Sequence, residues 1–150
     1  MCEICVVTNC YVSRDTLPRM KQLHEEQKQR MIERWDTVFQ ALGAEPRRQI
    51  VLSLMEAPED RALSLPEAAN PSYLREDPTE LTTELIHSHL PELADGGFVE
   101  WESEPFTVSR GPAFEEAAIV FEALQDRADA IPPQLAEGCQ RLEEKRGDAR

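Results

Sequence analysis

Residues 86–99, IHSHLPELADGGFV, decide the fold that this sequence predicts. They combine the end of an amphipathic helix with the start of a strand, because two glycines stop the helical pattern directly before Phe98. The same helix has a start signal, in which Asp77 can act as N-cap and Pro78 fits the first helical position. Its apolar residues have helical spacing: Leu81, Leu85, Ile86, Leu90 and Leu93.

Two features modify this picture of a helix followed by a strand. Pro91 lies inside the helical pattern and cannot donate to the carbonyl of His87, so we expect a kink. Beyond the glycines, residues 98–101 and 106–109 are two short strand candidates, and residues 102–105 join them as a hairpin.

The sequence before this segment predicts three more helices. The first begins near Ser13 to Thr16 and runs toward Leu42, with Gly43 as a left-handed cap. Glu45-Pro46 opens the second helix, whose apolar residues are Ile50, Val51, Leu54 and Met55. Ser64 and Glu67 have the spacing of a capping box, which predicts a short helix through Ala69.

The sequence after the hairpin predicts two further amphipathic helices. The first follows Gly111-Pro112 and ends at Pro132-Pro133, and its apolar stripe is Phe114, Ala117, Ala118, Phe121, Leu124 and Ala128. The second carries Leu135, Cys139 and Leu142 on its apolar face. We expect the charged tail from Glu143 onward to fray.

These elements predict a mainly α fold with a small β-hairpin, in the order of a winged helix-turn-helix with N- and C-terminal helical extensions. The expected divisions are a Cys-rich segment at 1–12, a helical arm at 13–35, the winged domain at 36–131, and a C-terminal helix with a frayed tail at 132–150.

Acidic residues dominate the charge of the chain. The 150 residues include 29 Asp and Glu against 16 Lys and Arg, a net charge of −13, and only three of the basic residues are Lys. One interpretation is an acidic protein that avoids nucleic acid. The other is adaptation to molar salt, where the Debye length is about 3 Å and surface repulsion is nearly abolished.

The location of the protein follows from two absences in the sequence. No apolar run approaches the ~20 residues that cross a bilayer, so we expect no membrane association. The first ten residues lack the basic head and apolar stretch of a signal peptide. We therefore expect a cytoplasmic protein, where thiols stay reduced.

Two segments resemble a known family. Residues 41–52, ALGAEPRRQIVL, resemble the LGDPTRLRIL opening of ArsR-like winged helix-turn-helix regulators, and residues 86–99 resemble that family's VSRHLKVLREAGLV segment. The form with Pro91 resembles versions of this domain from halophilic archaea. The resemblance covers about residues 36–125.

The resemblance implies a transcriptional regulator that reads a palindromic double-stranded DNA site. It implies a homodimer, paired through the N-terminal helix and the helix of residues 113–131, with recognition helices around residues 79–95 one DNA turn apart. If Ile86, Leu90 and Leu93 face inward, the outward residues that can meet base edges are Thr83, Glu84, His87 and Ser88. The cations available for phosphates are Arg47, Arg48, Arg75 and Arg110.

One pattern opposes this function. Residues 79–97 contain no Lys or Arg, and the hairpin turn carries two Glu and no basic residue. A DNA-binding domain ordinarily carries a basic stripe. The alternative hypothesis is a winged-helix protein–protein interaction module that does not bind DNA.

The cysteines raise a separate question. Cys2, Cys5 and Cys10 have the spacing C-x2-C-x4-C, and Cys139 or His24 could complete a tetrahedral zinc site with them. Alternatively, two of the thiols could form a redox-responsive disulfide, or all of them could be chemically idle. The sequence requires no other cofactor.

Two further functions find little support in the sequence. His87 and His89 point about 200° apart on a helix, so they cannot bind one metal ion together from it. The sequence also has no Gly-rich phosphate loop, no nucleophile elbow and no H-E-x-x-H spacing. We therefore expect no enzymatic activity.

Overall fold

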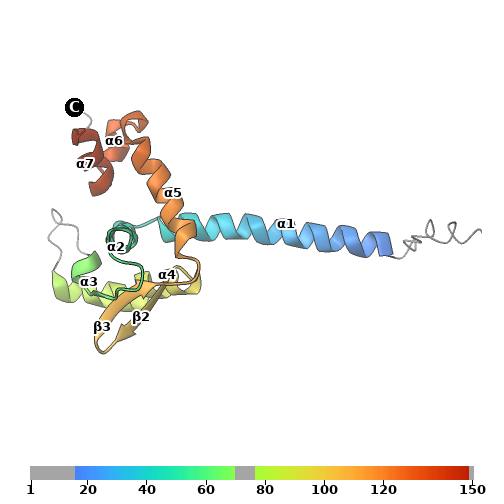
Figure 1. Ribbon diagram of the computed structural model, residues 1–150, viewed down its shortest axis with the longest axis horizontal. Coiled ribbons are helices and arrows are strands. Elements are labelled where there is room, and N and C mark those ends of the chain that lie inside the picture. Colours follow the sequence, from blue (N-terminus) through green and yellow to red (C-terminus); the bar gives the residue numbers. More distant parts are fainter. Residues whose placement is uncertain (1–15, 70–76, 149–150) are drawn as a thin grey trace, which may run out of the picture. The chain divides into compact units, whose positions relative to one another are not determined.

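The computed structural model describes residues 16–69 and 77–148, and its contacts divide the chain into two units at residues 36 and 37. In the first unit, the described residues belong to helix α1 (Thr16–Ala41), which confirms the predicted long helix (Figure 1). Its polar stretch at residues 24–30 is helical throughout. Five large apolar side chains of this unit lie exposed along it: Met20, Leu23, Met31, Ile32 and Trp35.

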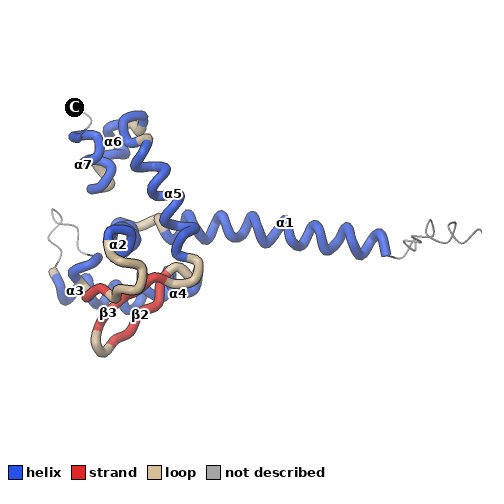
Figure 2. Tube along the Cα trace, in the orientation of Figure 1, coloured by secondary structure: helices blue, strands red, loops and turns tan. Residues whose placement is uncertain are grey.

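The second unit contains the last turn of α1 and the rest of the chain. Its first half consists of α2 (Glu45–Glu56), β1 (Leu63–Ser64), η2 (Glu67–Ala69), α3 (Pro78–Glu84), η3 (Leu85–His89) and α4 (Leu90–Asp95). Its second half consists of β2 (Val99–Ser103), β3 (Phe106–Arg110), α5 (Phe114–Asp126), η4 (Ala128–Ala130), α6 (Pro133–Ala136) and α7 (Gln140–Asp148). The described chain is mainly helical with one small sheet, as predicted (Figure 2).

The sheet is antiparallel and has the order β1-β3-β2. The hairpin of β2 and β3 confirms the predicted wing, with Val99 opposite Arg110 and Ser103 opposite Phe106. The prediction for Ser64 was wrong, because Ser64 does not begin a capped helix but pairs with Thr107 as part of β1. Two strand residues give too short a pattern for sequence periodicity to detect.

The core of the unit lies between α2, the helix of α3 to α4, and α5. Ile50, Val51 and Leu54 of α2 are completely buried, as the helical spacing predicted. Phe98, Phe114 and Phe121 are the largest of the fully buried side chains. Burying each such side chain stabilises the fold by roughly 1.5–3 kcal/mol.

The C-terminal segment belongs to this core and is not a separate extension. Cys139 and Leu142 are buried with it, and the amide N–H of Gln140 donates to Glu45 Oε1 at 3.2 Å. Leu135 was wrongly predicted to face inward, since 68% of it is exposed. Helix α7 continues to Asp148, through the region expected to fray.

Two other boundaries differ from expectation. Helix α5 ends at Asp126 and gives way to η4, well before the prolines at 132 and 133. Gly43 does not adopt the left-handed conformation expected of a cap; its N–H donates to the carbonyl of Gln40 at 3.1 Å in a tight turn. None of the described helices is long and apolar enough to cross a membrane.

Candidate nucleic-acid interface

The candidate recognition helix has well-defined ends. Asp77 caps its start, accepting a hydrogen bond from the N–H of Thr79 at 2.9 Å, and Pro78 occupies the first turn as predicted. At its end Gly97 has φ +77°, and the amide of Phe98 donates to the carbonyl of Leu93 at 3.0 Å. This is a Schellman motif, which turns the chain directly into the wing.

A π-helical turn, η3, lies in the middle of this helix and sets which side chains face the core. The fully buried residues are Leu81, Leu85, Leu90 and Leu93. In a regular α-helix Leu85 and Leu90 would point about 140° apart, since five residues advance about 500°. The N–H of Leu90 donates to the carbonyl of Leu85 in a wider turn, which places both side chains on the buried face.

This turn corrects one expectation, because Ile86 is only partly buried and Leu85 takes the core position. The π turn precedes Pro91, where a kink was expected, and helical residues run without a break from 78 to 95. A π bulge accommodates proline because the widened turn places the carbonyls differently from a regular α-helix.

The predicted outward face is exposed. Thr83, Glu84, His87 and Ser88 all lie on the solvent side of the helix. The hydroxyl of Thr83 donates to the carbonyl of Thr79 at 3.0 Å, so it offers lone pairs rather than a proton to a ligand. These four side chains therefore present mainly acceptors, with His87 and Ser88 able to donate.

The arginines expected to bind phosphates are engaged within the fold. Arg47 donates from Nη2 to the carbonyl of Gln40 at 2.8 Å and from Nε to that of Ala41 at 3.2 Å. Arg48 donates to the carbonyl of Leu42 at 2.7 Å. Helix α1 has no basic residue in its last turn, so these guanidinium groups neutralise the partial negative charge at its end.

Arg110 serves the end of α2 in the same manner. Its Nη2 donates to the carbonyls of Leu54 at 2.7 Å and Ala57 at 3.1 Å, and its guanidinium lies 4.7 Å from the ring centroid of Phe114. Helix α2 also lacks a basic residue in its last turn. The fourth cation of the prediction, Arg75, lies outside the described residues.

His89 joins the candidate recognition helix to this arginine network. Arg47 Nη1 lies 3.0 Å from His89 Nδ1, and because a guanidinium can only donate, Nδ1 accepts and the proton resides on Nε2. Burial first, and the charge of Arg47 second, lower the pKa of His89 below its usual 6.5. His89 is therefore neutral near pH 7 and has a structural role, joining α2 to the π turn.

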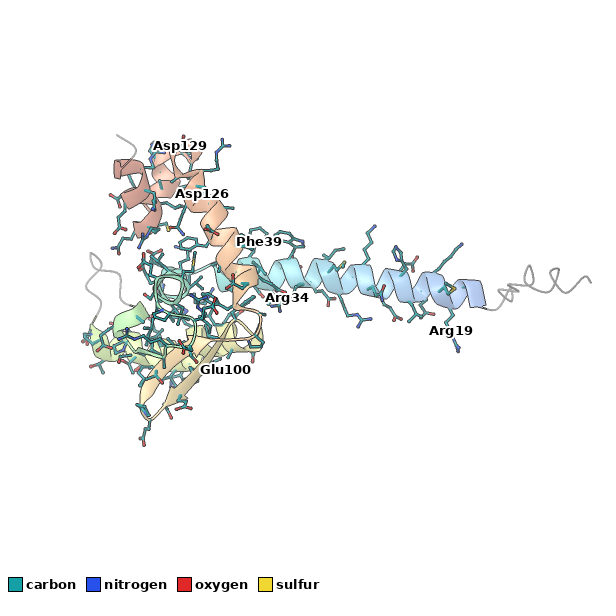
Figure 3. The ribbon with its side chains drawn as sticks, in the orientation of Figure 1. Arg19, Arg34, Phe39, Glu100, Asp126 and Asp129 are labelled. Carbon is teal, nitrogen blue, oxygen red and sulfur yellow. The ribbon has the colours of Figure 1, made fainter. Side chains whose placement is uncertain are left out.

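The exposed surface of the helix and wing is acidic. Residues 79–109 contain seven carboxylates and no Lys or Arg. Glu100 projects from β2, as Figure 3 shows, and Glu102 and Glu104 lie at the exposed end of the wing. A nucleic acid approaching this surface would meet no cation from these elements.

The cysteine hypotheses fall largely outside the described part of the chain. Cys2, Cys5 and Cys10 lie outside it, so zinc binding and redox switching there remain predictions. Cys139 is a free, buried thiol. Within residues 16–69 and 77–148, no three His, Cys, Asp or Glu side chains are grouped to hold a metal ion.

Sequence reasoning missed the roles of the arginines and one surface feature, a groove near the C-terminus that includes the exposed Leu135. The absence of basic residues from the last turns of α1 and α2 was a usable signal for the roles of the arginines.

Comparison with known proteins adds no relative, because no family model, curated protein or solved structure matches the chain.

Proposed function

We propose that this chain is a winged-helix transcriptional regulator that binds double-stranded DNA in concentrated salt. One observation carries the proposal: Thr83, Glu84, His87 and Ser88 form an exposed polar face on a capped helix whose opposite face is buried leucine. The helix leads directly into a β-hairpin wing. This combination suits insertion of the helix into a major groove.

The chemistry of the exposed face fits base edges better than phosphates. Glu84 can accept from the N4 amino group of cytosine, and Ser88 can bond to either type of group. His87 can donate to N7 or O6 of guanine through a ring N–H. Because these contacts lack cationic support, binding depends on salt to screen the carboxylates.

The proposed regulator acts as a homodimer in the cytoplasm. Met31 and Ile32 of α1 are 69% and 50% exposed, and Ile119 of α5 is 60% exposed. Large apolar side chains on two helices support pairing with a second copy, which would cover them. Pairing of this kind would present two recognition helices to a palindromic site.

A mobility-shift assay tests the proposal. The probe is the upstream region of the protein's own gene in molar KCl, and the variants are His87→Ala and Ser88→Ala. We expect each variant to weaken binding about 5- to 150-fold, the range for losing one good base contact. Glu122→Ala is the matched control, because Glu122 is an exposed residue of a different helix, α5. Unchanged binding by both variants would disprove the assigned face.

The engagement of Arg47, Arg48 and Arg110 favours a second candidate, a protein–protein interaction module that uses the acidic face to bind a basic partner. The substitution Glu102→Gln, at an exposed wing carboxylate with no assigned base contact, separates the two by the sign of its effect. Removing this negative charge strengthens binding to polyanionic DNA but weakens binding to a cationic protein. Glu122→Gln, at an exposed residue of α5, should change neither affinity.

The N-terminal cysteines add a proposed response to metal or to oxidation. Elemental analysis of protein purified without chelators measures bound zinc, and mass analysis after mild oxidation measures disulfide formation. Zinc at one equivalent per chain that is lost in a Cys2→Ser/Cys5→Ser variant supports the metal site. If neither zinc nor a disulfide is found, these thiols have no such role.

A further inference from the structure

A groove of about 750 Å³ lies near the C-terminal end of the second unit. We call it the C-terminal groove and define it by its main apolar lining residues: Phe39, Leu42, Phe121, Leu124, Ile131 and Leu135. Figure 3 labels Phe39, at the end of α1 in this unit. The volume falls within the roughly 300–1,000 Å³ of small-molecule sites.

The groove exposes apolar surface that an occupant would cover. Phe39 is 59% exposed, Leu124 41% and Leu135 68%. Removing such side chains from water is worth roughly 25 cal/mol per Å² in the occupant's favour. These residues are contiguous around one hollow, in contrast to single apolar residues scattered over a surface.

The charge around the groove is opposite to that of the chain. Its fifteen described lining residues include no Asp or Glu and two Arg, although 29 of the chain's 150 residues are acidic. Arg48 is paired with Glu45 at 2.8 Å, so its charge is already balanced. Arg127 is exposed, and among the described residues it has no ion pair, even with the neighbouring Asp126 and Asp129.

From these features we propose that the C-terminal groove binds a small apolar monocarboxylate. Its chain or ring would contact Leu124 and Leu135, and its carboxylate would pair with Arg127 beside the amide of Gln134. A second copy's α1 fits less well, because that helix carries five basic against four acidic residues and so offers no excess of negative charge. The proposal goes beyond DNA binding and does not depend on it.

Calorimetric titration of the full chain with decanoate, below its critical micelle concentration, tests the ligand class. We expect saturable binding of one decanoate per chain, with decanol bound about two- to fivefold more weakly, the effect of losing one exposed ion pair. Decyltrimethylammonium should bind more weakly than decanol. Equal affinity for the three compounds, or the absence of saturable binding, overturns the proposal.

Two pairs of variants locate the site. Arg127→Gln should remove the preference for decanoate over decanol, whereas Arg61→Gln, at an exposed arginine outside the groove, should leave it intact. Leu135→Asn should weaken both ligands at least about threefold, and Met20→Asn, at an exposed apolar residue outside the groove, should not. Equal effects within either pair place the ligand elsewhere.

Sedimentation equilibrium with and without decanoate distinguishes the other occupant of the groove. The proposal predicts an unchanged oligomeric state across the titration. Dissociation of a dimer at the same decanoate concentration as the calorimetric transition would show that a second copy covers the groove, and would overturn the assignment to a small ligand.

Discussion

The proposed DNA binding should strengthen as the salt concentration rises, contrary to the behaviour of most DNA-binding proteins. A protein that neutralises Z phosphates loses affinity with a slope of about −0.9Z in log K against log salt. In the helix and wing, residues 79–109, Z is zero because there is no Lys or Arg. Arg47, Arg48 and Arg110 are bound to backbone carbonyls of the fold.

The size of the rise can be worked out from the seven carboxylates of residues 79–109. A carboxylate and a phosphate about 10 Å apart repel by about 0.4 kcal/mol in water. Screening leaves about 0.15 kcal/mol at 0.1 M salt and almost nothing at 1 M. For the carboxylates of both protomers of a dimer, each near one phosphate, the relief is about 2 kcal/mol, or about 25-fold in affinity.

Fluorescence anisotropy of a labelled operator fragment, titrated at 0.1, 0.3, 1 and 2 M KCl, measures this slope. Circular dichroism at each salt concentration checks that the protein stays folded. An affinity that falls between 0.1 and 2 M KCl would show that cations of the chain bind the phosphates, and would refute the reasoning.

Three further predictions concern the fold that holds the interface. Arg110→Met should lower the free energy of unfolding, measured by urea titration, by about 3 kcal/mol, because charged hydrogen bonds at the end of α2 are lost. The control Arg61→Met, at an exposed residue, should lower it by less than about 0.5 kcal/mol. The pKa of His89 is lowered in the folded protein, so as the pH falls the unfolded chain takes up a proton first, and stability should fall below about pH 6.5. His89→Gln should flatten this pH dependence, measured as the midpoint of urea unfolding at each pH. An unchanged pH dependence in the variant would contradict this role of His89. Gly97→Ala should cost about 1–2 kcal/mol because φ is +77°, while Gly147→Ala, with open space around its Cα, should be neutral or stabilising in thermal melts.

Helix positions were predictable wherever a chemical start or stop signal coincided with apolar spacing. Asp77-Pro78 and Gly96-Gly97 define the candidate recognition helix in the sequence. In the structure Asp77 caps its start and Gly97 adopts a positive φ at its end. The exposed positions of Thr83 and Ser88 were also predicted, although Ser88 lies within the π turn. Local rules suffice where the determinants are local.

The phase of the recognition helix was not fully predictable. Leu85 and Ile86 are adjacent apolar residues, and a regular α-helix would favour Ile86 as the partner of Leu90 and Leu93. The π turn reverses this choice by adding one residue to the turn. Its formation depends on packing of Leu85 and Leu90 against the core, and on the contact between His89 and Arg47, which is distant in sequence.

The roles of the arginines were the least predictable feature of the candidate site, and they link the composition of the chain to its surface. Helices α1 and α2 and the turn η4 have no basic residue at their ends. Arginines from elsewhere supply the missing charge; Arg146, for example, donates to the carbonyls of Ala128 and Ile131. A guanidinium has five donors in a rigid fork and can satisfy several carbonyls at once, which a lysine cannot do with the same geometry. A chain with so few cations that uses them in this manner keeps its helix ends neutralised inside the fold and leaves acidic and hydroxyl groups on its outer face. An anionic partner of that face therefore needs cations from the salt solution between the two surfaces, and a partner that binds without them must itself be cationic.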